Sequence, residues 1–441
     1  MLIDSFNIIH FSECTALRTM RYRFPHPGIT MQSVLSSSST SSPSLSVAHD
    51  TRGAAWRVAI AGMVALSVAM GIGRFAFTPI LPMMLHDSSV TLTQGSWLAT
   101  GNYLGYFLGA LACMAVRGDA ARLIRIGLIA TVLLTAGMGV LQGQPAWLGL
   151  RFAAGMASAL VFVFTAGWCL HKLTELGHAA LGGIIFCGPG LGIAIPGLAA
   201  SGMVALGWHA TSAWIAFGVL SALLTAAVWS TIRPEARPHA APTAAAAGAT
   251  PGLDAPTTAI TLAYGLAGFG YIITATFLPV IARKVLPTGS IWPDLFWPMF
   301  GAGVALGAFL STRISLARDN RSLLATAYAM QAVAVAVSIV WPTVAGLALS
   351  STLLGLPFTA ITLFAMREAR RLWPHAAPRL MGLMTAAYGI GQIVGPPLAN
   401  RLFAATGGFS ASLAVAAASL VVGVLIFIVV KRASPLLPVR A

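Results

Sequence analysis

Twelve apolar segments, each about as long as a membrane-crossing helix, constrain the fold of this chain more than any other feature. A crossing helix needs about 20 mostly apolar residues. With soft boundaries, the segments lie at 57–85, 95–116, 124–142, 146–170, 180–204, 209–231, 258–282, 293–314, 322–341, 343–366, 380–403 and 409–430. Only helices and closed barrels satisfy their backbone groups in lipid, and no segment alternates with period two. The sequence therefore predicts an all-α integral membrane protein with twelve transmembrane helices.

The composition excludes a soluble protein and a nucleic-acid-binding protein. Residues of the set AVILMFWYC make up 57% of the chain and charged residues 8%, whereas a soluble domain carries about a quarter charged residues. The formal net charge is +15. Nucleic-acid binding requires basic residues gathered on one domain or face, but here they stand at the ends of apolar segments. The four Cys residues are scattered without ligand-like spacing. We expect no metal, no cofactor and no nucleic-acid partner.

The distribution of Lys and Arg predicts the orientation of the helices. If the first segment starts in the cytoplasm, 21 of the 26 Lys and Arg residues fall on the cytoplasmic side. Only Arg283, Lys284 and Arg401 fall outside, and Arg74 and Arg151 lie within segments. Because cytoplasmic loops carry the excess of positive charge, both termini are predicted to be cytoplasmic.

The polar stretches predict the domain organisation. The run of Ser residues before position 50 is low-complexity sequence, so we expect a disordered tail; alternatively, translation starts at Met20 or Met31. The stretch rich in Pro, Ala and Gly after Arg233 cannot build a core. The predicted units are a tail at 1–55, a six-helix half at 56–232, a cytoplasmic linker at 233–257, a second six-helix half at 258–432 and a tail at 433–441.

Three matches at one half-length indicate a duplication. They pair Gly71, Gly73, Leu81 and Pro82 with Gly268, Gly270, Leu278 and Pro279 at an offset of 197, Gly105 and Gly109 with Gly303 and Gly307 at 198, and Gly183, Gly190 and Gly192 with Gly382, Gly389 and Gly391 at 199. The matches follow helix order with little drift, so the two halves are predicted to be pseudo-symmetric.

Glycine and proline residues in the segments predict close helix packing and bends. Small residues at spacings of three and four let membrane helices approach closely, and proline removes a backbone donor. The expected packing and bend residues are Gly71, Gly73, Pro79, Pro82, Gly155, Gly188, Pro189 and Gly192. A functional interpretation of the glycines and the proline in residues 188–192 is that they form a bend that is used during conformational change.

The chain resembles the major facilitator superfamily of secondary transporters. Residues 71–84, reading GIGRFAFTPILPMM, resemble the first-helix signature of the bacterial branch often labelled YbfB/YjiJ-type. Arg151 followed by Gly155 resembles the fourth-helix motif of the superfamily, and Gly188 with Pro189 a shortened form of its fifth-helix motif. The resemblance spans about 56–432 and implies the major facilitator fold, alternating access and a bacterial inner membrane location; we expect a monomer.

One loop departs from the pattern of the superfamily. After the second helix the superfamily usually shows a glycine-rich signature with acidic and basic residues, but residues 117–122 read RGDAAR. Asp119 is the residue there that could supply a charge-relay role.

Two arginines inside segments are the first candidates for function, because an ionisable residue within a span is costly. Arg74 and Arg151 are predicted at similar depths, and a guanidinium forks onto a carboxylate or phosphate. The alternatives are a gating or a structural role. None of the 11 Asp and Glu residues falls clearly within a segment, while Asp294 and Glu368 lie near ends. Proton coupling would then rest on His209, His171 or an acid at a helix end.

Further polar residues are candidates for the cavity. Resemblance to the superfamily implies that the first, fourth, seventh and tenth helices line it, and Phe77, Thr78, Ser158, Thr165, Thr359 and Thr362 are the expected lining residues. Alternatively, Ser and Thr bond their own backbone. Tyr264, Tyr271, Gln392 and Asn102 are candidates for substrate contact or gating, with packing or hydrogen bonding between helices as the alternative. Tyr271 occupies the repeat position of Arg74.

The sequence therefore favours a secondary active transporter of a small molecule, with a small organic anion as the substrate that the two arginines favour. One alternative is proton-coupled efflux of lipophilic compounds, and one of another class is a receptor or scaffold that transports nothing. The chain has no HExxH, GxSxG or phosphate-loop motif. We therefore expect neither an enzyme nor a primary pump. The expected partners are a small-molecule substrate, the lipid bilayer and a coupling ion such as a proton.

Overall fold

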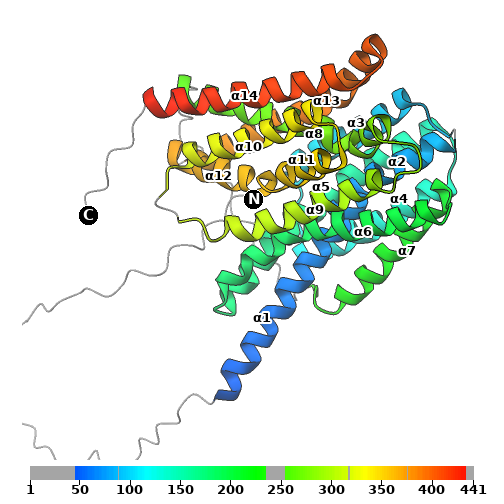
Figure 1. Ribbon diagram of the computed structural model, residues 1–441. Coiled ribbons are helices and arrows are strands. Elements are labelled where there is room, and N and C mark those ends of the chain that lie inside the picture. Colours follow the sequence, from blue (N-terminus) through cyan, green and yellow to red (C-terminus); the bar gives the residue numbers. More distant parts are fainter. Residues whose placement is uncertain (1–44, 88, 235–253, 316–317, 375, 434–441) are drawn as a thin grey trace, which may run out of the picture.

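The computed structural model describes residues 45–87, 89–234, 254–315, 318–374 and 376–433, and in these ranges all regular secondary structure is helical (Figure 1). The predicted tails and linker lie largely outside the described residues. Fourteen α-helices, a π-helix and a 3-10 helix stack end to end into twelve rods. This confirms the expected all-α fold with twelve helices.

The first six rods comprise the helices up to Trp229. They are α1 (Leu45–Leu66) with the π-helix η2 (Ser67–Phe75) and α2 (Phe77–His86), α3 (Leu92–Ala112), α4 (Ala120–Val140), α5 (Gln144–Glu175), the 3-10 helix η3 (Ala179–Cys187) with α6 (Gly188–Ala205), and α7 (Ala210–Trp229). The first rod thus begins at Leu45, earlier than the expected 57, so residues 45–55, which we expected in the tail, are helical.

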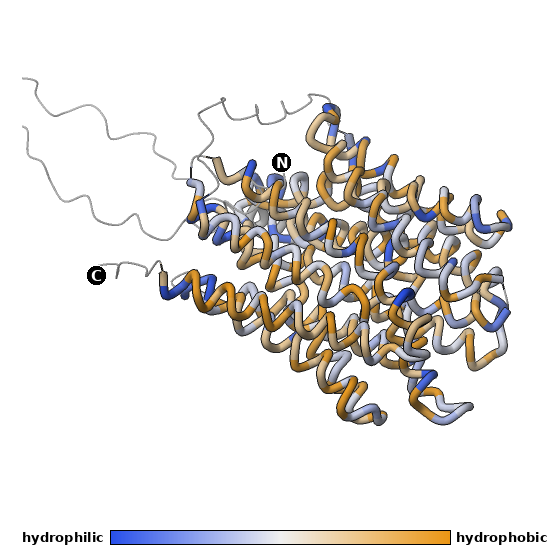
Figure 2. Tube along the Cα trace, turned by 90° about the horizontal axis from the view of Figure 1, so that it is seen from above, coloured by the Kyte–Doolittle hydropathy of each residue, from blue (hydrophilic) through white to orange (hydrophobic). Residues whose placement is uncertain are grey.

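The second six rods repeat the order of the first. They are α8 (Ala255–Val285), α9 (Trp292–Ser311), α10 (Asn320–Val340), α11 (Val344–Gly355) with α12 (Phe358–Leu372), α13 (Ala377–Thr406) and α14 (Ser410–Ala433). Ten of the twelve rods are long and apolar enough to cross a membrane on length and composition alone, and Figure 2 shows apolar residues along the helices. The other two, α3 and α13, pack against each other between the halves.

Helix pairing is the same in the two sets of six. In the first set α3 packs on α5, α4 on α7 and η2 on α6; in the second set α9 packs on α11, α10 on α14 and α8 on α13. Figure 1 shows α10 and α14 on one side of the bundle and α4 and α7 on the other. The halves meet through α3 against α13 and α6 against α9.

Glycines at matching repeat positions make the closest helix contacts. A Cβ atom on Gly71 would overlap the backbone of Gly192, and in the second half a Cβ atom on Gly391 would overlap the backbone of α8 at Gly265 and Phe269. These pairs join the first rod to the fifth and the seventh to the eleventh. Only glycine permits such backbone approach, which explains why these positions repeat in the sequence.

Gly192 and Gly202 lie on the same helix, α6, and provide a matched pair of substitutions. We expect Gly192→Ala to lower the melting temperature, because the added methyl group meets backbone atoms of Ser67 and Gly71 and overpacking costs about 1–3 kcal/mol. Gly202→Ala meets nothing within 4 Å and gains helix propensity, so its melting temperature should not fall. Thermal unfolding in detergent measures both; equal melting of the two variants would contradict the close contact.

The end of the bundle where α1 begins, α7 ends, α8 begins and α14 ends is called the linker end below; it lies at the left in Figure 1. Ion pairs gather at the linker end of the second half, where Arg321 is 1% exposed. Its Nε lies 3.1 Å from Asp319 and 3.9 Å from Glu368, and Glu368 also pairs with Arg371. In the first half, Asp119 accepts a hydrogen bond from the backbone N–H of Arg122 at 2.8 Å and so caps α4.

At the opposite end, Asp87 joins the end of the first rod to the start of α7. Its carboxylate accepts a hydrogen bond from the backbone N–H of Ala210 at 2.8 Å and lies 3.2 Å from His209 Nδ1, beside a cavity of about 210 Å³. Partial burial alone would raise the pKa of Asp87, but the bonds from Ala210 and His209, with His86 nearby, outweigh it and lower the pKa below 3.8.

The lowered pKa of Asp87 predicts a pH dependence of stability. A carboxyl whose folded pKa is lowered stabilises the fold above its unfolded pKa and loses that contribution as the pH falls through its folded pKa. Melting temperatures of the wild type should therefore fall below about pH 4, and Asp87→Asn should flatten that part of the curve. The control is Glu175→Gln at the linker end; an identical acid limb in wild type and Asp87→Asn would exclude the Asp87 contribution.

Candidate functional site

Arg74 lies where the first rod meets the second half. Its side chain comes from η2 and is 2% exposed. Its Nη2 donates a hydrogen bond of 2.8 Å to the Gln392 side-chain carbonyl on α13, and its guanidinium carbon lies 3.8 Å from the ring centre of Tyr106. Its Nε has no hydrogen-bond partner among the described residues. Arg74 therefore reaches across the interface and keeps one donor unused.

Gln392 connects Arg74 to Tyr271 on α8. The Gln392 amide nitrogen donates to the Tyr271 hydroxyl, while its carbonyl accepts from Arg74. The three predicted candidates thus form one chain of hydrogen bonds from the first half to the second. Arg74 and Tyr271 are equivalent in the repeat, so the pseudo-symmetry brings two different side chains face to face with Gln392 between them.

Tyr271 continues into a stack of tyrosines. Its ring stacks on Tyr388 at 5.9 Å between centres, and the ring of Tyr388 lies 4.8 Å from that of Tyr264. The Tyr264 hydroxyl donates to Thr362 Oγ1 on α12 at 3.1 Å. The seventh and tenth rods thus contribute polar atoms that extend from Arg74 toward the linker end.

Arg151 makes a different set of contacts. It comes from α5, is 2% exposed, and donates to the backbone carbonyls of Gly73 at 3.2 Å and Arg74 at 2.9 Å. Both carbonyls lie in the π-helix, in the turn before Pro79. Because proline has no backbone N–H, Pro79 cannot donate a hydrogen bond to this turn. Its guanidinium carbon lies 4.9 Å from the ring centre of Phe77. Arg151 therefore positions the backbone that carries Arg74.

Asn102 supports Arg151 rather than Arg74. Its side-chain nitrogen donates to the Arg151 carbonyl at 2.9 Å. Asn102 is fully buried and its side-chain oxygen has no hydrogen-bond partner among the described residues. The α3 and α5 backbones approach closely here, because a Cβ atom on Gly155 would overlap the carbonyl of Asn102.

The predicted lining residues divide into two groups. The Thr78 hydroxyl donates to the Ala275 carbonyl across the interface at 3.0 Å, and the Ser158 hydroxyl lies 2.7 Å from the Ala69 carbonyl and 2.8 Å from that of Ala154. The buried hydroxyls of Thr165 and Thr359 have no hydrogen-bond partner among the described residues. The first group therefore joins helices, and the second keeps polar atoms available.

The charges around Arg74 and Arg151 are not balanced. Each described Asp and Glu lies at or near an end of its helix, and the hydrogen-bond partners of both arginines are neutral: a side-chain amide and backbone carbonyls. A buried cation without a counter-ion is costly. In the described residues, the centre of the bundle is thus a positive site without an acid beside it.

An aromatic cluster around Arg74 was not predicted. Besides Tyr106, the guanidinium carbon lies 5.4 Å from the ring centre of Tyr103 and 5.2 Å from that of Phe75. The Phe358 ring lies 5.0 Å from that of Tyr271 and 6.5 Å from that of Phe75. Tyr103 and Tyr106 lie three apart on one face of α3, which is the one sequence signal that could have grouped them.

Hydrogen bonds between the halves close the site toward the end opposite the linker. They join Tyr103 to Thr276 at 2.9 Å, Ser201 to the Asp294 carbonyl at 2.7 Å and Thr93 to Asn400 at 3.2 Å. Together with the Thr78 contact, they hold the first half against α8, α9 and α13. A molecule at Arg74 is therefore separated from that end of the bundle by this layer.

Comparison with known proteins identifies the family. Residues 66–428 match the family described as "Uncharacterised MFS-type transporter YbfB", where MFS denotes the major facilitator superfamily. The chain belongs to this family. It is also similar to the "Uncharacterized MFS-type transporter YceJ" of Bacillus subtilis (strain 168), at 26% identity over 359 residues, which cover 78% of this chain and 88% of that protein. Membership confirms the resemblance, the major facilitator fold of a multi-pass membrane protein, and the class: a transporter, not an enzyme.

Gln392→Leu tests the link between the halves. It removes both bonds of the Arg74–Gln392–Tyr271 chain, so we expect the end opposite the linker to separate more often. Spin labels at the exposed positions Gln142 and Thr288, in a background without native cysteines, report the distance between the halves at that end; the distribution should extend to longer distances.

The matched control is Gln331→Leu. Gln331 is also buried, but its amide bonds the Leu354 carbonyl within the second half, at 3.3 Å. If both Leu variants give the wild-type distance distribution, the Gln392 bridge does not hold the halves together.

Proposed function

We propose that this protein is a secondary active transporter that moves a small organic anion across the bacterial inner membrane by alternating access, and that Arg74 binds the anion. The observation that carries this proposal is the state of the Arg74 guanidinium, which is buried between the halves. Among the residues that the structure describes, it has only neutral partners and its Nε is unpaired.

The electrostatics of the site favour an anion over a cation or a neutral molecule. A carboxylate or phosphate accepts two parallel N–H bonds from a guanidinium. In the described part of the chain, the Nε of Arg74 is unpaired and lies beside an Nη2 that is bonded to a neutral amide. A bound anion would also supply the missing counter-charge for Arg151, whose Nη2 bonds the Arg74 carbonyl. A cationic substrate would be repelled by both arginines.

The same contact links binding to conformational change. An anion that takes the place of the Gln392 carbonyl on Arg74 breaks the chain of bonds from η2 to Tyr271. The ligand would then have one affinity for the conformation with the halves separated and another for the conformation with the halves in contact. A ligand shifts the populations of two conformations only if these affinities differ. Alternating access needs such a difference between the states.

The orientation in this proposal places the linker end in the cytoplasm. Arg125, Arg313, Arg321, Arg371 and Lys431 all lie near that end of their helices, and positive charge accumulates on the cytoplasmic side. The described Asp and Glu residues lie near helix ends, and His209 and His171 are exposed. The proposed mechanism therefore uses no proton-carrying side chain in the middle of the membrane. We propose that the protein acts as a monomer and that exchange for a second anion drives transport.

Arg74→Gln tests the proposal through ligand-dependent stability. A ligand at one hundred times its dissociation constant stabilises a protein by about 2.7 kcal/mol, so a panel of small organic anions should contain members that raise the melting temperature of the wild type. Arg74→Gln should lose that shift while melting no lower than the wild type without ligand, because it removes an unbalanced buried charge. Arg74→Lys, which keeps the charge but not the fork, should retain a weaker shift.

The control variant is Arg313→Gln, which removes an exposed Arg at the linker end and should keep the full shift. Amphipathic compounds and neutral sugars complete the panel. If only lipophilic compounds stabilise, and equally in wild type and Arg74→Gln, efflux of such compounds replaces the anion proposal. Anion flux into liposomes that contain the purified protein separates a transporter from a receptor, since a receptor binds the anion without moving it.

A further inference from the structure

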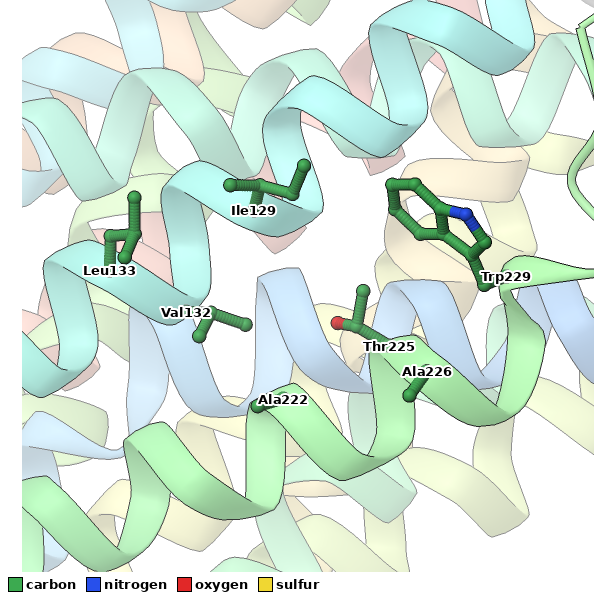
Figure 3. Close-up of a pocket in the computed structure, with 7 residues that line it drawn as sticks. All are labelled: Ile129, Val132, Leu133, Ala222, Thr225, Ala226 and Trp229. Atoms are coloured by element: carbon green, nitrogen blue, oxygen red, sulfur yellow. The ribbon is translucent and has the colours of Figure 1, made fainter.

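A groove on the surface of the first half lies between α4 and α7 and shares no lining residue with the Arg74 site. Its volume is about 370 Å³. Figure 3 shows side chains of both helices turned toward it. Its lining residues are Ile129, Val132 and Leu133 on α4 and Ala222, Thr225, Ala226 and Trp229 on α7.

The groove exists because α7 presents small residues beside larger ones. Ala222 and Ala226 lie four residues apart and so on one face of α7, opposite Ile129 and Leu133. The side chains of Ile129 and Leu133 are 45% and 65% exposed. Since α4 and α7 form one side of a membrane-embedded bundle (Figure 1), exposed apolar walls of this kind face hydrocarbon.

The end of the groove nearest the linker end carries a cation. The Arg125 guanidinium carbon lies 4.3 Å from the ring centre of Trp229, and its Nη2 donates to the Trp229 carbonyl at 2.7 Å. Its Nε is buried without a hydrogen-bond partner among the described residues. Arg122, three residues earlier and exposed, lies on the same face of α4. Arg125 therefore retains a donor for an anionic group at the mouth of the groove.

A second unpaired donor lies deeper in the groove. The Thr225 hydroxyl lines the wall, is 6% exposed and has no partner among the described residues. Helical rise places Thr225 about 6 Å below Trp229 along α7, toward the middle of the membrane. From the mouth inward, the groove thus offers a cation, an aromatic ring, a hydroxyl and apolar walls.

We propose that this groove binds one anionic glycerophospholipid. The phosphate lies at Arg125 and Arg122, an ester carbonyl accepts from the Thr225 hydroxyl, and an acyl chain fills the space between Ile129, Leu133 and the two alanines. Charge complementarity selects this occupant: a zwitterionic lipid would bring its own cation to the arginines, and a free phosphate would leave the apolar walls uncovered. The equivalent helix pair in the second half, α10 and α14, has Arg321 engaged by Asp319 and Glu368, so we expect one site per molecule.

Native mass spectrometry of the purified full-length protein tests the proposal. Phosphatidylglycerol and phosphatidylcholine of identical acyl chains are titrated separately into delipidated protein in detergent. We expect a first phosphatidylglycerol to bind at lower concentration than phosphatidylcholine. Arg125→Gln should weaken that first association about fivefold, as expected for one cation near a headgroup. Ala226→Phe fills the groove from a lipid-facing position and should weaken binding of both lipids at the first site.

The matched control is Arg313→Gln, which removes an exposed Arg that also lies over an aromatic ring, Phe309, at 4.8 Å but follows α9 rather than lying on α4 or α7. It should keep the first association constant of the wild type. An equal loss in Arg313→Gln and Arg125→Gln would overturn the proposal in favour of general surface charge. Unchanged binding in Ala226→Phe would also overturn it, as would a protein dimer that Ala226→Phe abolishes, because a second copy would then cover the groove.

Discussion

The positive charge of Arg74, held between two halves by neutral groups alone, is the constraint on which the rest of the structure depends. The charge is tolerated because the guanidinium bonds an amide, lies against Tyr106 and sits on a backbone that Arg151 holds in place. Each of these supports comes from a different helix. Close glycine contacts join α3 to α5, and α5 packs on η2, so the packing of these helices determines which groups surround the charge.

Much of the fold could be predicted from the sequence, because hydrophobic length is a strong signal in a membrane. The twelve helices and the family follow from the apolar segments and from residues 71–84. The start of α1 at Leu45 was missed because charged and polar residues, among them His49, Asp50 and Arg52, interrupt the apolar pattern before 57. A helix that leaves the apolar region has no periodic signal to mark its beginning. The break of the first rod into α1, η2 and α2 was also not predictable, because a π-helix depends on where neighbouring donors such as Arg151 lie.

The candidate site could be predicted as a set of residues but not as a set of contacts. Arg74, Tyr271 and Gln392 were each identified by polarity within an apolar segment, and the structure links them. Their pairing depends on the rotation of α8 and α13 about their axes and on the distance between the halves, neither of which a single sequence contains. For the same reason Tyr103, Tyr106 and Phe358 were not grouped with Arg74, since aromatic residues in a membrane helix are far more often packing residues.

The two buried arginines, alike in residue type and depth, differ in what they bind, and this difference separates their roles. Arg151 donates to backbone carbonyls of η2, which cannot move away without distorting the first rod. A ligand could therefore bind the Arg151 guanidinium only by distorting that rod. Arg74 donates to the side chain of Gln392, which can turn aside by rotation about its own bonds. A ligand can therefore exchange with the partner of Arg74 far more easily than with those of Arg151. In the proposed mechanism, such an arrangement of one fixed and one exchangeable cation would let an anion arrive and leave without unfolding the helix that binds it.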